Sequence, residues 1–169
     1  MLIDIRTISR STGASLAIET EIGLNELDFS FQGYCLTRPP FFAGLLQNVG
    51  NGILTLTGRV STGYEGECAR CLQPVCEELD IPLAETYRPL TSADASDDEE
   101  GYRYEGSQLD IGQAIRDNLL PAIPQRLLCR ETCLGLCPDC GANLNEKSCN
   151  CAQAREGRLS PFDQLKQLL

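Results

Sequence analysis

Alternating apolar and polar positions run through the first part of the chain, and this period of two predicts β-strands. Residues 1–8 and 15–22 show the alternation, with Ser11-Thr12-Gly13 suited to a turn between them. The clearest case is 53–65, where apolar and β-branched residues alternate, and a further strand is predicted at 76–87. The pattern therefore predicts a sheet-rich protein in which the last two of these strands form a hairpin.

Three stretches between these strands are less regular. Residues 25–40 are of mixed character and favour no element. The apolar run 41–46 lies between Pro39-Pro40 and the turn-forming residues 48–52, so we expect a loop that contains one short element. Residues 91–101 carry five acidic side chains, which predicts a solvated acidic loop.

Helical periodicity is confined to two places. Asp110 is suited to cap a helix over 111–120, and Pro121 and Pro124 are expected to end it. One face of this helix would carry Ile111, Ala114, Ile115, Asn118 and Leu119. Ser160-Pro161 is expected to open a second, short amphipathic helix over 162–169, docked on the domain.

Together these elements predict an α+β fold, with an antiparallel β-sheet or partly open barrel and few helices. We expect a β-rich domain at 1–125, which contains the acidic loop near 91–101. Residues 126–169 are expected to form a cysteine-rich, zinc-binding segment with the C-terminal helix, packed on the first part through a shared zinc site.

The residue types exclude several kinds of catalysis. Histidine is absent from the 169 residues, which removes the Ser-His-Asp and Cys-His arrangements and argues against catalytic zinc sites built with His. We find no P-loop and no dinucleotide-binding G-x-G-x-x-G motif, and no spacing of carboxylates that marks an acid–base pair. The sequence predicts no catalytic residues, so we do not expect an enzyme.

Charge is distributed unevenly along the chain. The net charge is −10, but residues 126–169 hold six basic and five acidic side chains, whereas residues 1–125 hold eight basic and 19 acidic ones. Nucleic-acid binding normally needs a basic surface. Any direct RNA contact would therefore come from the basic residues of the C-terminal part, which are Arg126, Arg130, Lys147, Arg155, Arg158 and Lys166.

The compartment affects how the cysteines are interpreted. No run of about 18 apolar residues predicts a membrane span, and the N-terminus lacks the basic start and apolar core of a signal peptide. We therefore expect a cytoplasmic protein whose thiols stay reduced, which favours metal binding over disulfides.

Eight of the ten cysteines occur in four close pairs: Cys68/Cys71, Cys129/Cys133, Cys137/Cys140 and Cys149/Cys151. Zinc in tetrahedral coordination, with Zn–S bonds of about 2.3 Å, holds its sulfur ligands about 3.8 Å apart, a separation that C-x-x-C turns reach easily. Two fully cysteinyl zinc sites, closed and structural, are the predicted result. The pair Cys149/Cys151 fits only if the backbone curls, because side chains two apart on a strand lie too far from each other.

How the pairs combine is open to two interpretations. Residues 137–151 form a short loop that closes with little loss of entropy, which favours one site there and a second from Cys68/Cys71 with Cys129/Cys133. The alternative combines Cys68/Cys71 with Cys137/Cys140. Competing explanations of the whole pattern are structural disulfides, a thioredoxin-like redox motif and an iron–sulfur cluster.

Four further residues receive structural interpretations. Cys35 and Cys76 stand outside the pairs, and we expect them to be small buried or half-buried side chains. Arg59 and Arg70 are expected to be solvated surface charges.

The cysteine motifs resemble those of the YceD family, named for large ribosomal RNA subunit accumulation. The resemblance rests on residues 67–75 (Glu-Cys-Ala-Arg-Cys-Leu-Gln-Pro-Val) and 129–145, and on Cys149-Asn150-Cys151 and Ser160-Pro161-Phe162 with Leu165. It covers most of the chain from about Ile53 onward. It implies a role in large-subunit ribosomal RNA synthesis or processing and no known enzymatic activity. Relatives that lack the last four cysteines imply that Cys68, Cys71, Cys129 and Cys133 form the more basic site.

These observations lead to one functional expectation and two alternatives. We expect a ribosome biogenesis factor that promotes large-subunit ribosomal RNA accumulation or processing, acting as a non-enzymatic adaptor stabilised by two zinc ions. Its acidic surface would suit a basic ribosomal protein or a pre-ribosomal particle. The alternatives are an RNA-binding zinc module and a thiol redox protein.

Overall fold

A computed structural model describes residues 1–23, 33–90 and 101–151 of the chain. The chain forms two compact units. The first consists of Met1–Gly66 and Cys76–Gln125, and the second of Glu67–Val75 and Arg126–Leu169. Residues 67–75, which lie within the predicted 1–125 domain, thus belong to the second unit.

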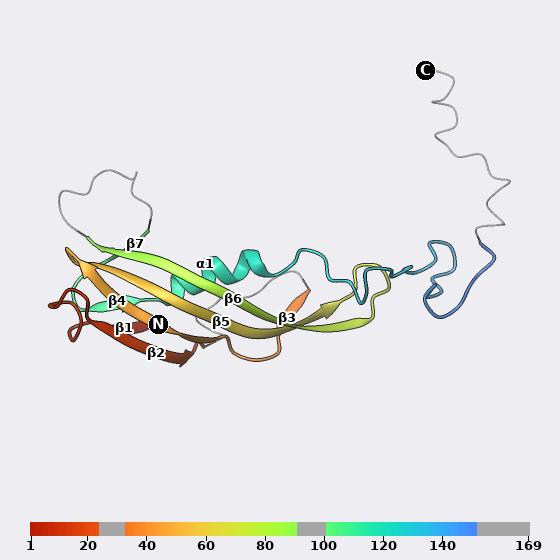
Figure 1. Cartoon of the computed structure of the whole chain (residues 1–169). Coiled ribbons are helices and arrows are strands. Elements are labelled where there is room, and N and C mark those ends of the chain that lie inside the picture. The colour runs from red at the N-terminus through yellow and green to blue at the C-terminus, as the bar shows by residue number, and fades with distance from the viewer. Residues whose placement is uncertain (24–32, 91–100, 152–169) are drawn as a thin grey trace, which may run out of the picture. The chain divides into compact units, whose positions relative to one another are not determined.

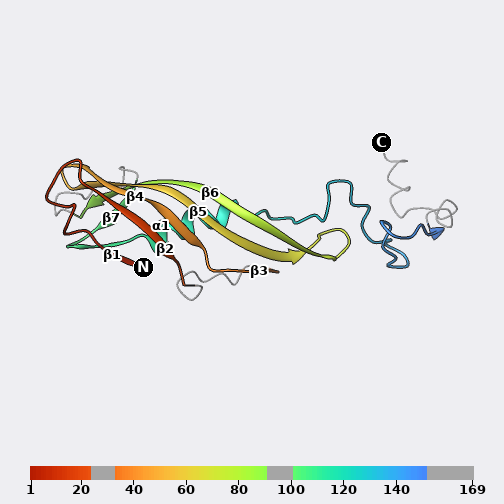
Figure 2. The same ribbon diagram turned by 60° about the horizontal axis from the view of Figure 1, so that its bottom comes forward.

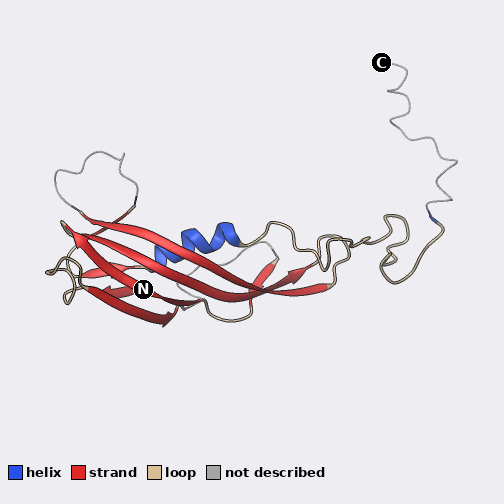
Figure 3. Ribbon diagram, in the orientation of Figure 1, coloured by secondary structure: helices blue, strands red, loops and turns tan. Residues whose placement is uncertain are grey.

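Strands dominate the described residues (Figures 1 and 3). A six-stranded sheet has the order β2-β4-β5-β6-β7, and β3 also pairs with β5. A separate two-stranded sheet pairs β1 with β8. The strand bounds are β1 Leu2–Asp4, β2 Ser15–Glu21, β3 Tyr34–Leu36, β4 Phe41–Gly50, β5 Ile53–Glu67, β6 Pro74–Pro89, β7 Tyr102–Tyr104 and β8 Gln108–Asp110.

The larger sheet is mixed and open. β2 pairs antiparallel with β4 over its whole length, and β4 pairs antiparallel with the part of β5 from Ile53 to Ser61. β7 instead runs parallel to β6, with Tyr87 opposite Tyr102. Because β2 and β7 each pair with one neighbour among the described residues, the sheet does not close into a barrel. The sequence therefore predicted the sheet-rich class correctly, whereas the parallel pair was not foreseen.

The core lies between the sheet and the helix α1, Gly112–Ala122, which runs along one face of the sheet (Figures 1 and 2). Four helix-side residues predicted to share a face, Ile111, Ala114, Ile115 and Leu119, are buried against strand residues. Those strand residues are Ile18, Phe42, Leu46, Leu54, Leu56, Val60, Leu83 and Tyr87. The burial of this apolar surface is the main stabilisation of the first unit.

The bounds of α1 differ from those predicted. Asp110 belongs to β8, and the N-cap residue is Ile111, which makes no side-chain capping bond. Asp110 nevertheless accepts a hydrogen bond from the Gly112 N–H, 2.9 Å from Oδ1. Pro121 lies inside the last turn and does not end the helix, because a proline so near the C-terminus removes only one intrahelical bond.

The expected loop around 41–52 is instead a long hairpin. β4 continues to Gly50 and β5 begins at Ile53, so that only Asn51 and Gly52 form the turn. Their φ angles, +53° and +74°, are those of the tight turn that the Asn-Gly dipeptide favours. Asn48, which suggested a loop, is buried and uses its amide to hold the backbone carbonyls of Ile8 and Ser9 at 2.8 and 3.1 Å.

The predicted strand at 1–8 is shorter than expected and has a different partner. β1 ends at Asp4 and pairs with β8, with Ile3 opposite Leu109. Ile5 and Ile8 are buried all the same, in the turns that follow. Their burial accounts for the apolar pattern that suggested a longer strand.

Parts of several predictions lie outside the described residues. These are the acidic loop over 91–100, the helix over 162–169 and residues 25–32 of the irregular stretch 25–40. In the described ranges, no helix has the length and apolar character needed to span a bilayer.

Candidate metal centres

Two turns in the second unit share one backbone design. The first, Cys68–Leu72, follows β5, and the second, Cys137–Gly141, lies further along the chain. In each turn the N–H of the first cysteine donates to the carbonyl five residues later, at 2.8 Å, and that cysteine's own carbonyl accepts from the N–H four residues later, at 2.9 Å. We call these two turns the knuckles.

Each knuckle ends in a left-handed residue. Leu72 has φ of +62° and Gly141 has φ of +70°. Glycine adopts this conformation without a clash, whereas a side chain with a Cβ pays a steric penalty there. The second knuckle therefore has the residue that the turn favours, and the first holds an exposed leucine in a strained conformation.

Backbone N–H groups point at the sulfur of the first cysteine in each knuckle. The backbone N–H of Cys129 donates to the Cys68 sulfur, and the N–H groups of Arg70 and Cys71 donate to the same sulfur. These bonds lower the pKa of Cys68 to about 6, although burial opposes them. In the second knuckle, the N–H groups of Cys140 and Asp139 lower the pKa of Cys137 to about 6. Both leading cysteines are thus prepared to be thiolates, the form that binds metal.

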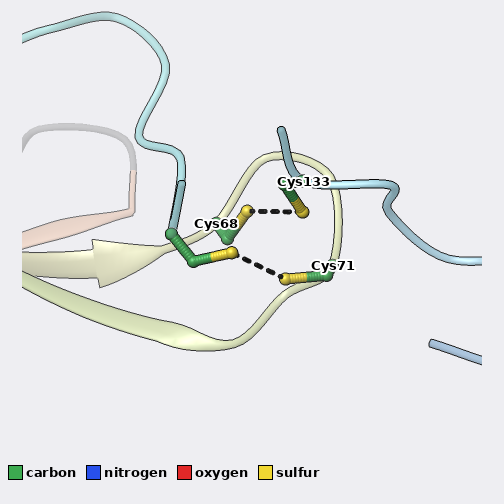
Figure 4. A group of neighbouring side chains, drawn as sticks. Cys68, Cys71 and Cys133 are labelled. Atoms are coloured by element: carbon green, nitrogen blue, oxygen red, sulfur yellow. Dashed lines mark hydrogen bonds between the residues drawn. The ribbon is translucent and has the colours of Figure 1, made fainter. Parts of the chain in front are cut away.

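The cysteines of the first knuckle meet a later pair. Figure 4 shows Cys68 and Cys71 on the turn after β5, with the Cys68 sulfur facing that of Cys133. The Sγ atoms of Cys68 and Cys133 are 3.8 Å apart, and those of Cys71 and Cys129 are 3.6 Å apart. All four lie within 4.8 Å of one another. We call this group tetrad 1.

A second group forms within the short loop that follows. The sulfurs of Cys137, Cys140, Cys149 and Cys151 also lie within 4.8 Å of one another and make up tetrad 2. The chain bends at Asn150 and is helical at Cys151, which supplies the curl that a one-residue spacing requires. All eight predicted cysteines are therefore gathered in the two favoured groups, and the alternative combination of Cys68/Cys71 with Cys137/Cys140 is wrong.

The geometry of tetrad 1 suits a single tetrahedral ion. Sulfur separations of 3.6 and 3.8 Å agree with the roughly 3.8 Å expected around zinc and far exceed the S–S bond of about 2.05 Å. Burial and the neighbouring sulfurs raise the pKa of Cys129 to about 12. Four thiolates at this distance repel one another, so a bound cation is what would let all four ionise together.

The two tetrads differ in burial. In tetrad 1, Cys68, Cys71 and Cys133 are buried and Cys129 is half-buried. In tetrad 2 only Cys137 is buried, whereas Cys140 is exposed. Solvent therefore reaches tetrad 2 more readily.

Two residues around tetrad 1 have roles that the sequence did not indicate. Arg70, expected to be a solvated charge, donates to the carbonyl oxygens of Glu131 and Cys133 at 3.2 and 2.8 Å. It thereby joins the two chain stretches that supply the cysteines. Asn145 donates from Nδ2 to the Cys133 sulfur at 3.3 Å. Burial alone would raise the pKa of Cys133, but this bond, with the other bonds to the sulfur, outweighs burial and the pKa is lowered.

Neither contact has a sequence signature. An exposed arginine and a loop asparagine are recognised as supports of a site only when the fold brings them to it. Arg59, by contrast, pairs with Asp80 at 2.9 Å between two exposed side chains, as a surface charge does.

The prediction for the two remaining cysteines is wrong, because Cys35 and Cys76 are both exposed. Cys35 lies opposite Glu65 in the β3–β5 register, and the Cys76 sulfur lies 3.9 Å from Glu65 Oε2. Both cysteines therefore share the outward face of the sheet with a charged residue. Strand alternation, which sets this direction, is hard to anchor in a stretch as short as β3.

Fold and sites define a β-rich protein that carries two four-cysteine knuckle sites. The family model described as large ribosomal RNA subunit accumulation protein YceD matches residues 56–169. This match covers more than half of the chain, which therefore belongs to the YceD family.

Relatives among curated proteins agree with this assignment. An uncharacterized protein of Mycobacterium tuberculosis is 33% identical over 152 residues, which cover 85% of this chain and 70% of the relative. The chloroplastic large ribosomal RNA subunit accumulation protein YCED homolog 1 of Arabidopsis thaliana is 33% identical over 64 residues, 37% of this chain and 20% of the relative. Its Zea mays counterpart is 41% identical over 56 residues, 32% of this chain and 19% of the relative. No solved structure gives a significant match.

Proposed function

We propose that tetrads 1 and 2 each hold one zinc ion and that both sites are structural. The observation that carries this is the convergence of eight sulfurs into two groups, each within 4.8 Å. Thiolate ligands select zinc over the hard cations, and a group this tight surrounds a single ion, whereas a cluster of several irons would separate its ligands further. A site closed by four cysteines leaves no position for water, so it supplies folding energy and not catalysis.

We further propose that the protein is a non-enzymatic ribosome biogenesis factor of the cytoplasm, promoting large-subunit ribosomal RNA accumulation or processing. The family's description and the names of the plant relatives support this role. The lack of histidine in the whole chain supports a non-enzymatic mode of action. In this view the zinc sites shape a surface that other molecules recognise.

The partner we propose is a basic ribosomal protein or a pre-ribosomal particle. Residues 1–125 carry 19 acidic and eight basic side chains, and such a surface attracts basic proteins and repels phosphates. Direct RNA contact has less support, because residues 126–169 carry six basic against five acidic side chains, and one of the six, Arg130, is already bonded to Asn145. A redox role has less support too, since it needs a thiol that is both exposed and of lowered pKa, and the thiols whose pKa is lowered, Cys68, Cys133 and Cys137, are all buried.

A pull-down at low and high salt tests the partner. Tagged protein should enrich ribosomal proteins or precursor particles at low salt and lose them at high salt, because surface charges are screened. Nuclease treatment separates the alternatives: complexes that survive RNA removal support the protein partner, and complexes that vanish support the RNA-binding module. No ribosomal enrichment at low salt would contradict the adaptor proposal.

A genetic experiment tests the cellular role. Depletion of the protein should lower mature large-subunit ribosomal RNA relative to small-subunit RNA. Re-expression of the wild-type chain should restore the ratio, and re-expression of a Cys71→Ser chain, which lacks a ligand of tetrad 1, should not. An unchanged ratio upon depletion would contradict the role.

A further inference from the structure

One segment belongs to both candidate sites. Residues 141–148 lie between the two cysteine pairs of tetrad 2, because Cys140 precedes them and Cys149 follows. A metal in tetrad 2 would therefore fasten both ends of this segment. The same residues pack around tetrad 1, so that one short loop closes one site and surrounds the other.

The contacts with tetrad 1 are hydrogen bonds of ordinary length. The Leu144 N–H donates to the Gly135 carbonyl at 2.9 Å. Glu146 accepts at Oε1 from Gln73 Nε2 at 2.9 Å, next to the first knuckle. Asn145 donates from Nδ2 to the Cys133 sulfur at 3.3 Å. A thiolate ligand that accepts such a bond is held in place and is less repelled by its neighbours.

The Asn145 amide is fully used, which fixes its orientation. Its oxygen accepts from Arg130 Nη2 at 2.7 Å and from the Leu134 N–H at 2.9 Å. Its nitrogen donates to Asn143 Oδ1 at 2.8 Å as well as to Cys133. These four bonds exhaust the capacity of a side-chain amide. A flipped amide would turn its oxygen toward the sulfur, so the N–H must face it.

This segment has no apolar core of its own. No side chain from 141 to 148 is buried, and Leu144 is only half-buried. Without an apolar core of its own, the segment gains its order from hydrogen bonds and from closure at Cys140 and Cys149. If tetrad 2 is empty, the entropy of ordering Asn145 must be overcome when tetrad 1 binds its ion.

We infer that the two sites bind metal cooperatively, and that Asn145 is the positioning residue through which an ion in tetrad 2 raises the metal affinity of tetrad 1. The inference rests on the proposed function, because it needs both sites to bind metal. Coupling is reciprocal, so an ion in tetrad 1 raises the affinity of tetrad 2 by the same factor. Loss of an outer hydrogen bond to a metal ligand typically lowers affinity about 10–100-fold, and we expect a factor near the lower end.

The test is a titration of the full chain with Co²⁺ and Zn²⁺ against a competing chelator. Cys149→Ser combined with Cys151→Ser removes tetrad 2, and the affinity of tetrad 1 should fall about tenfold. Asn145→Asp keeps the acceptor for Arg130 and Leu134 but replaces the donor with a carboxylate oxygen. The Asn145→Asp variant should lower the metal affinity of tetrad 1 at least as much, and it should shift the cobalt–thiolate charge-transfer band. Ser148→Ala, at an exposed side chain of the same segment that carries no ligand, is the matched control and should leave the metal affinity of tetrad 1 unchanged.

The combined variants decide between coupling and independent damage. Asn145→Asp placed in the Cys149→Ser, Cys151→Ser chain should weaken tetrad 1 by less than the product of the separate effects, because both changes remove the same interaction. Unchanged affinity of tetrad 1 without tetrad 2, or fully multiplicative effects, would overturn the coupling while leaving the two zinc sites in place. A wild-type chain that binds no Co²⁺ or Zn²⁺ would overturn both proposals.

Discussion

The two tetrads use the same knuckle but connect very different lengths of chain. In tetrad 1, Cys68 and Cys133 are 65 residues apart, and Cys71 and Cys129 are 58 apart. Tetrad 2 lies within residues 137–151. Closing a long loop removes more conformational entropy than closing a short one. An ion in tetrad 1 would therefore affect the fold of the whole second unit, whereas an ion in tetrad 2 would order a local loop.

Burial strengthens the contrast. Tetrad 1 is mostly buried and tetrad 2 is mostly accessible. Ligand exchange and chemical attack at thiolates need access to the sulfur. Two sites with the same four-cysteine ligands can thus differ in how readily they exchange an ion, because their sulfurs differ in burial.

Loss of a ligand should show the largest difference between the tetrads. Cys71→Ser should remove the ion of tetrad 1 and with it much of the roughly 10–16 kcal/mol that a structural zinc site supplies. Hydrogen exchange should then report lost protection at the Ala69 and Leu136 amides, which donate to Leu127 and Arg70. Amides between β4 and β5 should stay protected, because the core of the first unit is intact.

Cys140→Ser is the matched variant in tetrad 2. It should release one ion yet keep the Ala69 amide protected, since tetrad 1 remains filled. Equal loss of protection in both variants would contradict the assignment of tetrad 1 as the anchoring site.

Stepwise removal of metal should separate the sites by accessibility. Under a chelator, tetrad 2 should lose its ion first, and N-ethylmaleimide should label Cys140 before Cys71. Native mass spectrometry with peptide mapping follows both events. Cys35 and Cys76, exposed and outside the tetrads, should be labelled at once with or without chelator. Earlier labelling of tetrad 1 would reverse the proposed order.

A substitution at Gly141 probes the second knuckle alone. Gly141→Ala places a Cβ in a left-handed conformation, which costs about 1–2 kcal/mol, although no atom within 4 Å would clash with it. Thermal unfolding should show the lower stability, and zinc competition should show a lower zinc affinity. Gly106→Ala is the control, because Gly106 has a similar φ of +73° and open space but lies in the first unit; zinc affinity should be unchanged there.

The opposite substitution in the first knuckle should have the smallest effect and the opposite sign. Leu72→Gly relieves the left-handed strain, and the flexibility that glycine adds to the unfolded chain offsets part of the gain. A net stabilisation of about 0.5–1 kcal/mol is expected, because the Leu72 side chain is 57% exposed and loses little burial. Leu134→Gly, at a leucine that is also exposed but has no positive φ, should not raise the free energy of unfolding measured by chemical denaturation. Lower stability of the Leu72→Gly variant would contradict this, because it would mean that contacts of the Leu72 side chain outweigh the strain.

The sequence predicts what depends on local pattern. The alternation at 53–65 gave the central strand, the 3.6-residue period gave the buried face of α1, and cysteine spacing with loop closure gave both tetrads. It fails where distant residues decide the outcome. Asn48 resembles a loop residue until the carbonyls of Ile8 and Ser9 come within reach. The parallel pairing of β7 depends on β6, where Tyr87 lies opposite Tyr102, 15 residues later in the chain.

The supports of the sites show the same limit. Nothing in the spacing of Asn145 or Arg70 marks them as partners of tetrad 1, since their roles depend on how two separate stretches meet. Ligands can be read from their own chemistry, whereas the residues that orient ligands become visible only in three dimensions.

Native mass spectrometry of the protein as isolated, paired with elemental analysis, tests the central claim most directly. It should show a chain carrying two zinc ions with all ten thiols reduced, and one zinc after Cys149→Ser with Cys151→Ser. A chain isolated from cells without bound metal, or with its tetrad sulfurs joined as disulfides, would contradict the account.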